Sequence, residues 1–134
     1  MTQKIFEADD KALSSVMSFV ESELEEAGAN MKSLMQVCVA VEEIFVNVAH
    51  YAYPGKNGDV SLSIDVEDSV ATLVFTDSGI PFNPLEKADP DITLSAEDRS
   101  IGGLGIFMVK KSMDEVRYER KDESNVFTMI KEIK

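Results

Sequence analysis

Residues 60–66 alternate apolar and polar side chains, and this alternation constrains the fold more than any other feature of the chain. Val, Leu and Ile stand at the even-numbered positions and Ser and Asp at the odd ones, so the segment predicts a β-strand with one apolar face. Residues 70–76 predict a second strand, joined to the first as a hairpin. Because a sheet with one apolar face has to be covered by a second layer, these strands favour a fold in which helices pack on a sheet.

Two helices are predicted before these strands. Residues 10–27 place apolar side chains three and four positions apart, with Asp9 or Asp10 as the N-cap. Asn30 can cap the second helix, which we expect over residues 31–53.

The second half of the chain completes an α+β pattern. Residues 77–103 contain three prolines and scattered acids with no sustained period, which indicates a long loop of the kind that often serves as a lid or binding loop. A helix is predicted over residues 104–112. Three further strands are predicted over residues 115–120, 126–133 and 4–7. The predicted fold is α+β, a single domain over residues 1–134 with helices on one face of a mixed, largely antiparallel sheet.

The charge of the chain limits its partners. The 134 residues include 13 Lys and Arg against 25 Asp and Glu, a formal net charge of −12. This charge argues against duplex DNA, RNA and anionic membranes as partners, because phosphate backbones are held mainly by Lys and Arg. A small anionic ligand is compatible with it, since such a ligand responds to local dipoles and to a metal ion.

The cysteine content and the length of the apolar runs favour a soluble protein. Cys38 is the single cysteine, which rules out an internal disulfide and a Cys-based zinc site. The first residues have no signal-peptide pattern, and the longest apolar run falls far short of the roughly 20 residues that span a bilayer. We therefore expect a soluble cytoplasmic protein without membrane contact.

Polar side chains form one line along the second predicted helix. Gln36, Glu43, Asn47 and His50 fall opposite the face expected in the core, which carries Leu34, Cys38, Val41, Phe45, Val48 and Ala52. Apolar residues flank the polar line on both sides, so we expect a helix buried nearly all round, with Glu43 and Asn47 facing an enclosed polar site. A plain solvent-exposed face is the alternative interpretation. An Asn oxygen is a suitable Mg²⁺ ligand, and Glu43 could orient or deprotonate a nucleophile beside it.

Two further motifs suit a nucleotide. Asp77 ends a predicted strand, where its carboxylate could accept a hydrogen bond from an exocyclic amine such as that of adenine, and Gly79 would let a flat ring approach the backbone. The run Gly102-Gly103-Leu104-Gly105 leads into a helix and could present backbone N–H groups to phosphate. Each motif alone also fits a strand-ending turn or a flexible hinge.

Three motifs of the chain resemble, in order, the three nucleotide-binding boxes of the GHKL (Bergerat-fold) ATPase and kinase superfamily. These motifs are Glu43-Ile-Phe-Val-Asn47, Asp77-Ser-Gly79 and Gly102-Gly-Leu-Gly105. Within it, the chain is similar to the anti-sigma-factor serine kinases of bacterial partner-switching systems, the RsbW type. The similarity covers roughly residues 5–133. It implies a two-layer α/β sandwich in which residues 83–101 form a lid over ATP.

The resemblance also implies roles for single residues. Glu43 would be the catalytic base, Asn47 a ligand of Mg²⁺ and Asp77 the anchor of adenine. Further contacts to the nucleotide would come from Gly79, Gly103, Leu104 and Gly105. The implied reaction transfers the γ-phosphate of ATP to a serine of an anti-anti-sigma protein with a STAS domain, and the implied partners also include a sigma factor and a second copy of the chain.

Departures from the family pattern leave the protein substrate open. Tyr51-Ala52-Tyr53 stands where many members have His-Ala-Tyr, so His50 lies one position early, and Pro81 replaces a second glycine. Arg99 and Lys110 are near enough in sequence to touch phosphate, but solvated charges are the simpler interpretation. Two other functions fit the same residues: an ATP-gated module that binds a regulator without transferring phosphate, and an α+β adaptor with a degenerate pocket.

Overall fold

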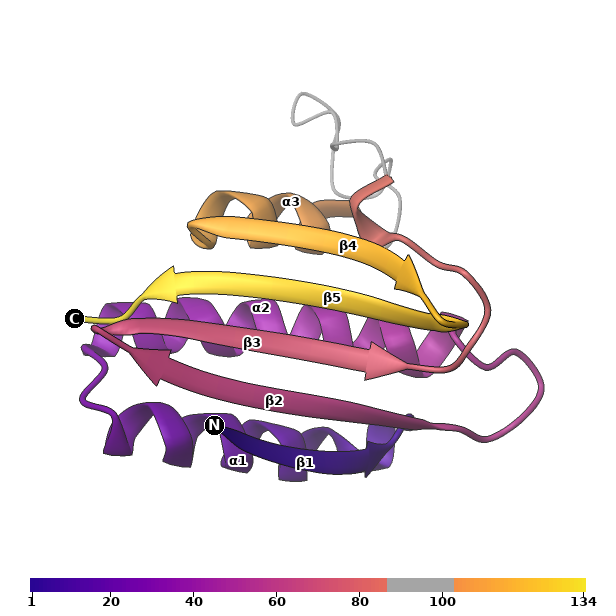
Figure 1. Cartoon of the computed structure of the whole chain (residues 1–134), viewed down its shortest axis with the longest axis horizontal. Coiled ribbons are helices and arrows are strands. Elements are labelled where there is room, and N and C mark those ends of the chain that lie inside the picture. The colour runs from indigo at the N-terminus through magenta and orange to yellow at the C-terminus, as the bar shows by residue number, and fades with distance from the viewer. Residues whose placement is uncertain (87–102) are drawn as a thin grey trace.

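The computed structural model describes residues 1–86 and 103–134, which form a five-stranded sheet with helices on one face (Figure 1). The order of the strands across the sheet is β1-β2-β3-β5-β4. Their bounds are Thr2–Glu7 for β1, Asp59–Glu67 for β2, Val70–Asp77 for β3, Glu115–Lys121 for β4 and Ser124–Glu132 for β5. The predicted strands are therefore all present, and the α+β class is confirmed.

Every neighbouring pair of strands in the described residues is antiparallel, so the expectation of a mixed sheet was wrong. Two tight hairpin turns contribute to this arrangement, Asp68-Ser69 between β2 and β3 and Asp122-Glu123 between β4 and β5. All four turn residues have positive φ, between 52° and 67°, as two-residue hairpin turns require. The strands β3 and β4 run in the same direction, but β5 lies between them and is antiparallel to both.

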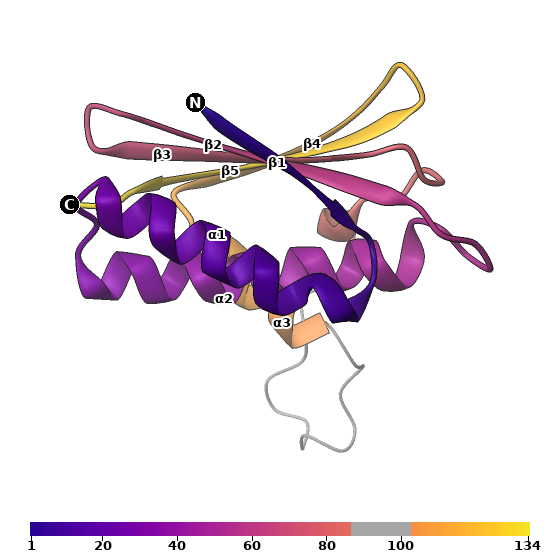
Figure 2. The ribbon, with the colours of Figure 1, turned by 90° about the horizontal axis from the view of Figure 1, so that it is seen from below.

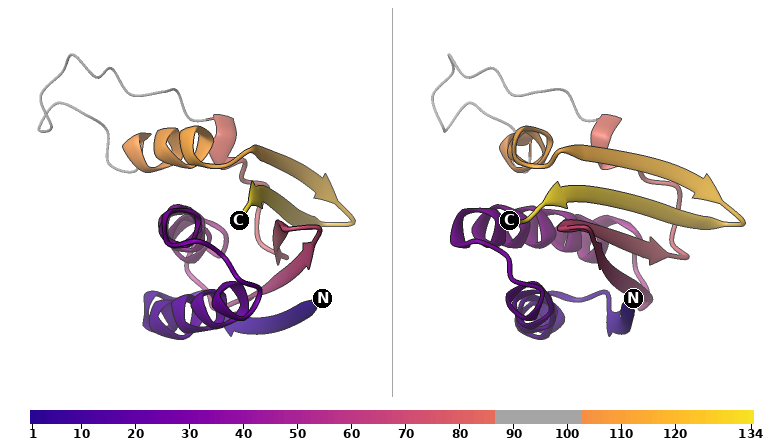
Figure 3. Two further views of the ribbon diagram at one scale, coloured as in Figure 1. Left: turned by 90° about the vertical axis from the view of Figure 1, so that its left-hand side faces the viewer. Right: turned by 60° about the vertical axis from the view of Figure 1, so that its left-hand side comes forward.

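The helical layer of the described residues consists of α1 (Leu13–Glu26), α2 (Met31–Tyr51) and α3 (Gly103–Ser112), with short 3₁₀ turns at Asp10–Ala12 and Pro84–Glu86. Figures 2 and 3 show the three α-helices on the same side of the sheet. The central helix α2 contacts α1 on one flank and α3 on the other. This arrangement is the two-layer sandwich that the resemblance implied.

A side-chain cap marks the start of α2 but not the start of α1. The carboxylate of Asp9 accepts a hydrogen bond from the backbone N–H of Lys11 at 2.8 Å, but the next residues form a 3₁₀ turn and the α-helix starts only at Leu13. The side chain of Asn30 accepts a hydrogen bond from the backbone N–H of Ser33 at 2.8 Å, which is the predicted N-cap of α2. That helix ends at Tyr51, slightly before the predicted end.

The hydrophobic core lies between the sheet and the helices. Alternate residues of β2 and β3 point into it, as their sequence pattern predicts. Fully buried side chains come from both layers and include Val16, Val20, Leu24, Val37, Ile44, Phe45, Leu62, Leu73, Phe75 and Met129. Among the described helices, α2 is long and apolar enough to cross a membrane, but half of its most apolar window is buried inside the protein, as is usual for a core helix.

The outer side of α2 is open to solvent, so the prediction of a helix buried nearly all round was wrong. Met31, Met35 and Val39 are 69%, 61% and 48% exposed. Cys38, expected in the core, is only partly buried. Among the described elements, the sheet covers one side of α2 and the other two helices cover its flanks, and the side with Met31, Met35 and Val39 is exposed.

Candidate functional site

The four side chains of the polar line along α2 differ in burial. Asn47 is 4% exposed, Gln36 and Glu43 are both half-buried, and His50 is exposed. The Nε2 atom of His50 lies 2.9 Å from a carboxylate oxygen of Asp10, and both side chains are open to solvent. Of these four side chains, Asn47 alone is therefore buried, and the enclosed polar site formed with Glu43 stays a prediction.

The side-chain amide of Asn47 is oriented by its own helix. Its Nδ2 atom donates a hydrogen bond to the backbone carbonyl of Glu43, one turn earlier, at 2.7 Å. The nitrogen end of the amide is thus used by the backbone. The oxygen Oδ1 is then the atom of this side chain that suits a hard cation such as Mg²⁺.

The first turn of α3 lies directly against the carboxylate of Glu43. A Cβ atom built on Gly105 would lie 1.9 Å from Oε2 of Glu43, far inside van der Waals contact. Glycine is the residue that permits this approach, because any side chain would displace the carboxylate. The structure therefore brings Glu43 of α2 together with Gly105 of the glycine run.

Asp77 is a buried carboxylate at the end of β3, only 5% exposed. Its Oδ1 atom accepts two hydrogen bonds, both at 2.9 Å: one from the backbone N–H of Gly79 and one from Nδ2 of Asn125. Its Oδ2 atom accepts none within the described parts of the chain, 1–86 and 103–134. A buried acceptor without a donor is costly, so this oxygen is suited to a ligand that donates a hydrogen bond.

A cavity adjoins this carboxylate and is otherwise mostly apolar. Its lining residues come from α2, from the strands β3, β4 and β5, and from the segment after β3: Ile44, Val48, Ala52, Phe75, Asp77, Phe82, Pro84, Tyr118, Asn125 and Phe127. Its volume is about 10 Å³, room for about one water molecule. The cavity as it stands is therefore smaller than a purine base.

The turn after Asp77 is fixed against the end of α2. A Cβ on Gly79 would lie 2.2 Å from the backbone oxygen of Ala52, and the same oxygen accepts a hydrogen bond from the N–H of Ile80 at 2.8 Å. From β4, the guanidinium of Arg120 donates to the carbonyl of Gly79, also at 2.8 Å. Gly79 is therefore required by close packing of backbone on backbone.

Tyr53 ties the same turn to β2. Its hydroxyl accepts a hydrogen bond from the N–H of Ser78 at 2.9 Å and donates one to the carbonyl of Asp59 at 2.6 Å. Burial raises the pKa of this hydroxyl, and the Asp77 and Asp59 carboxylates add to the effect against the opposing hydrogen bonds. The hydroxyl thus keeps its proton and its role as a donor.

Sequence reasoning missed the residues that surround Asp77 from the C-terminal hairpin. Asn125 faces Asp77 in the register of β3 and β5 and is 4% exposed. From β4, the hydroxyl of Tyr118 donates a hydrogen bond to Asn125, and the guanidinium of Arg120 donates one to the carbonyl of Gly79. One signal was available in the sequence. Asn125 stands two residues before Phe127 in a strand pattern, so it is a polar residue at an inward position.

Some predicted site residues are described only in part or lie outside the described residues. Gly103 and Leu104 begin α3, and only their backbone placement is described. Gly102, Arg99 and most of the predicted lid over residues 83–101 lie outside the described residues; its first part contains the 3₁₀ turn Pro84–Glu86. Phe82, just before that turn, stacks on Tyr51 with ring centroids 5.3 Å apart.

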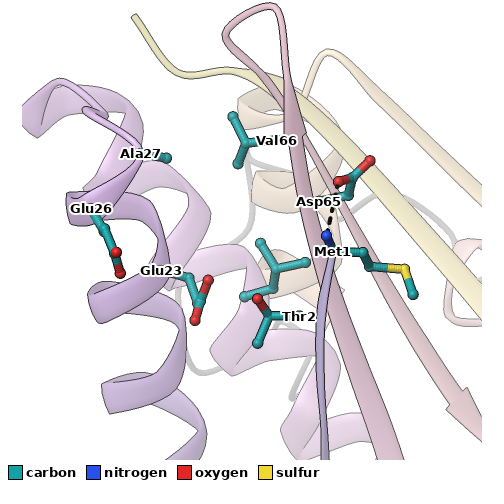
Figure 4. Close-up of a pocket in the computed structure, with 8 residues that line it drawn as sticks. Met1, Thr2, Glu23, Glu26, Ala27, Asp65 and Val66 are labelled. Atoms are coloured by element: carbon teal, nitrogen blue, oxygen red, sulfur yellow. Dashed lines mark ion pairs between the residues drawn. The ribbon is translucent and has the colours of Figure 1, made fainter.

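A second and larger pocket lies elsewhere, between α1 and the strands β1 and β2 (Figure 4). Its volume is about 320 Å³ and its charged groups are Glu23, Glu26, Asp65 and the N-terminal ammonium of Met1, which lies 3.6 Å from Asp65. None of the predicted site residues lines it. The chemistry-bearing residues therefore belong to the smaller cavity and to the neighbouring part of α2.

Within the described residues, no group of three or more His, Cys, Asp or Glu side chains is placed to hold a metal ion. A protein-only metal cage is therefore absent from that part of the chain. The donor set that is present, one buried amide beside one carboxylate, fits Mg²⁺, which usually takes one or two protein ligands and completes its shell with phosphate oxygens and water.

Comparison with known proteins places the chain in a family. The model of the family described as "Histidine kinase-like ATPase domain" matches residues 6–131. An anti-sigma F factor from Clostridium acetobutylicum is 28% identical over 100 residues, which is 75% of this chain and 70% of that protein. A serine-protein kinase RsbW from Staphylococcus aureus is 30% identical over 115 residues, covering 81% of this chain and 71% of the relative.

Solved structures show the same fold. The RsbU and RsbW domains of a Mycobacterium tuberculosis protein match with a TM-score of 0.65 and 15% identity, over 99% of this chain and 33% of that one. The Acinetobacter baumannii histidine kinase AdeS matches with a TM-score of 0.55 and 12% identity, over 99% of this chain and 68% of that one. With the family match over nearly the whole sequence, the chain belongs to the histidine kinase-like ATPase domain family.

Proposed function

We propose that the protein is an ATP-dependent serine kinase of the anti-sigma-factor type. The observation that carries the proposal is the carboxylate of Asp77, buried in a mostly apolar cavity with one oxygen that lacks a donor in the described residues. Membership in an ATPase-domain family supports ATP as the ligand. Relatives named anti-sigma F factor, serine-protein kinase RsbW and serine/threonine-protein kinase BtrW support the transfer of phosphate to a protein.

Asp77 would bind the base. Its Oδ2 atom would accept a hydrogen bond from the exocyclic amine of adenine, while Ile44, Val48 and Phe127 of the cavity lining would contact the apolar faces of the ring. Gly79 would hold the turn beside the base close to the end of α2.

The phosphates would extend from the base along α2 towards Asn47 and the start of α3. Asn47 Oδ1 would hold Mg²⁺, which supplies charge neutralisation on the phosphate oxygens when it is bound. Backbone N–H groups of Gly103, Leu104 and Gly105 would bind phosphate at the N-terminal end of α3, where the helix dipole favours an anion.

Glu43 would act on the protein substrate. Its carboxylate lies against the first turn of α3 and is only half-buried, so a serine hydroxyl brought by a partner could reach it. The serine Oγ would attack the γ-phosphorus, the bond from that phosphorus to the bridging oxygen would break, ADP would leave, and the serine proton would pass to Glu43. Because such transfer depends mainly on positioning, a carboxylate of ordinary basicity is sufficient.

We further propose the partners. The serine substrate would be an anti-anti-sigma protein with a STAS domain, and a sigma factor would bind in competition with it, in the cytoplasm and with the kinase as a homodimer. The net charge of −12 is consistent with protein partners of this kind and unfavourable for direct nucleic-acid binding.

The test uses the full chain, Mg²⁺, radiolabelled ATP and purified STAS-domain proteins from the same organism. A kinase labels one of these proteins, and replacement of the acceptor serine by alanine abolishes the label. If nucleotide binds but no STAS protein is labelled, the chain is an ATP-gated binding module. If ATP does not raise the melting temperature of the chain at all, the nucleotide site itself is wrong.

A further inference from the structure

Asn125 is the second residue of β5 and is a buried amide whose hydrogen-bonding capacity is fully used. Its Nδ2 atom donates to Oδ1 of Asp77 at 2.9 Å and to the carbonyl of Ile80 at 2.7 Å. Its Oδ1 atom accepts from the backbone N–H of Phe82 at 3.2 Å and from the hydroxyl of Tyr118. An amide offers two donors and two acceptor lone pairs, so any rotation of this side chain breaks several buried bonds.

This amide determines which oxygen of Asp77 is available. With donors from Asn125 and Gly79, Oδ1 is occupied, and the carboxylate cannot turn about its axis without losing both bonds. Oδ2 is left as the acceptor that can meet a ligand in the cavity. The same amide holds the backbone at Ile80 and Phe82, which forms part of the cavity wall.

A fixed acceptor discriminates between purines. Adenine has an exocyclic amine at position 6 and can donate to Oδ2, whereas hypoxanthine has a carbonyl oxygen there. That oxygen would face a carboxylate oxygen with no proton between them, in a site from which water is largely excluded. A buried polar group left without its partner penalises the wrong ligand more than an apolar contact would.

We propose that Asn125 is the positioning residue that sets the base preference of the site, by holding Asp77 so that Oδ2, which accepts no hydrogen bond from the described residues, can meet the base. The inference rests on the proposed function, because it requires that ATP binds at Asp77. It goes beyond that function in assigning selectivity for a 6-amino base to an amide of β5. Asn125 acts through Asp77, so its replacement should change discrimination between bases rather than transfer of phosphate as such.

The isosteric substitution Asn125→Asp isolates this role. It keeps the shape of the side chain and an acceptor for Phe82 and Tyr118, but places an oxygen against Oδ1 of Asp77 and the carbonyl of Ile80. Two carboxylates in contact repel or share one proton, and the orientation of Asp77 is lost. Asn125→Ser is the complementary variant, because it keeps a donor on the same Cβ without adding charge.

The experiment compares the Kd of ATP and of inosine triphosphate by calorimetry with the full chain and Mg²⁺. The wild type should prefer ATP by roughly 10- to 100-fold, the usual effect of a hydrogen bond to a charged group. In Asn125→Asp this ratio should fall to within about threefold of unity, with Asn125→Ser in between. The exposed Asn57→Asp is the matched control, since it makes the same chemical change at the surface and should retain the wild-type ratio.

The outcomes separate the two proposals. If the wild type prefers ATP and both Asn125 variants keep its full preference, the positioning role is wrong and the kinase proposal stands. If the wild type binds neither nucleotide, or binds both equally, the adenine site at Asp77 is wrong and the positioning role fails with it. Loss of stability alone would weaken the binding of both nucleotides together and would leave the ratio intact. If Asn125→Asp does not fold, an unchanged ratio in Asn125→Ser therefore overturns the inference.

Discussion

Gly105 of α3 packs its Cα against the carboxylate of Glu43 of α2, so closely that a methyl group at position 105 would lie 1.9 Å from Oε2. The contact joins two segments that are more than 60 positions apart in the sequence. It places the proposed base beside the backbone that we propose as the phosphate-binding end of α3. Both the glycine and the carboxylate are needed for this arrangement, and each can be tested separately.

Gly105→Ala should separate activity from stability. The atom in the way is the end of a flexible side chain, so Glu43 can move aside, and alanine is favoured over glycine within a helix by about 1 kcal/mol. We expect a melting temperature equal to or slightly above that of the wild type, and a phosphotransfer rate at least about tenfold lower because the carboxylate is displaced. Gly55→Ala is the inverse control: with φ of +72° and open space around it, it should lose about 1 kcal/mol of stability and keep its activity. Equal rates in wild type and Gly105→Ala would contradict the assigned contact.

Gly79→Ala should damage both stability and nucleotide binding. Its Cβ would meet the backbone oxygen of Ala52 at 2.2 Å, and a backbone atom cannot be displaced cheaply. Overpacking of this kind typically costs about 1–3 kcal/mol. Urea denaturation should show that loss, and ATP should bind more weakly because the turn beside Asp77 shifts. A variant with unchanged stability would mean that the turn is not packed against α2.

Asn47→Ala should weaken the binding of ATP only where Mg²⁺ contributes. We expect the Kd of Mg·ATP to rise by about tenfold or more, the order expected for loss of one metal ligand or its orienting partner. The Kd of ATP measured with excess chelator should change little. Calorimetry with and without Mg²⁺ measures both quantities, and an equal loss under both conditions would assign Asn47 a purely structural role.

Cys38 should be a slow nucleophile at neutral pH. Burial, followed by the carboxylates of Glu21 and Glu25, raises the pKa of its thiol from 9.0 to about 11. The raised value means that the folded state favours the protonated thiol, so this group begins to destabilise the fold as the pH rises above 9. At pH 8 the thiolate fraction should be about 100-fold lower than for an exposed cysteine. Alkylation rates of the native and the urea-unfolded chain at pH 8 measure the difference, and similar rates would contradict it.

Much of the fold was readable from the sequence because its patterns are local. Alternation over residues 60–66 identified β2, and Asn30 identified the start of α2, since an N-cap depends only on neighbouring residues. The exposure of Met31, Met35 and Val39 could not be predicted in the same way. Apolar composition on several sides of a helix does not indicate how many other elements cover it.

The candidate site was predictable only in part, for a similar reason. Glu43, Asn47 and Asp77 stand in short motifs, and the structure buries Asn47 and Asp77 and leaves Glu43 half-buried. Asn125 carries no motif, and its importance follows from the pairing of β3 with β5, which brings it opposite Asp77. Long-range register of this kind is set by tertiary packing, so a residue that depends on it is found only in the folded structure.

The most direct test of the account is the rate of phosphotransfer by Glu43→Gln, measured with a STAS-domain partner and alongside the Kd of Mg·ATP. The glutamine keeps the shape of the side chain and its place beside Gly105 but cannot take the serine proton. We predict a turnover lower by about 10²- to 10⁴-fold, with nucleotide affinity nearly unchanged. Transfer at the wild-type rate would contradict the central claim that Glu43 is the group that activates the serine.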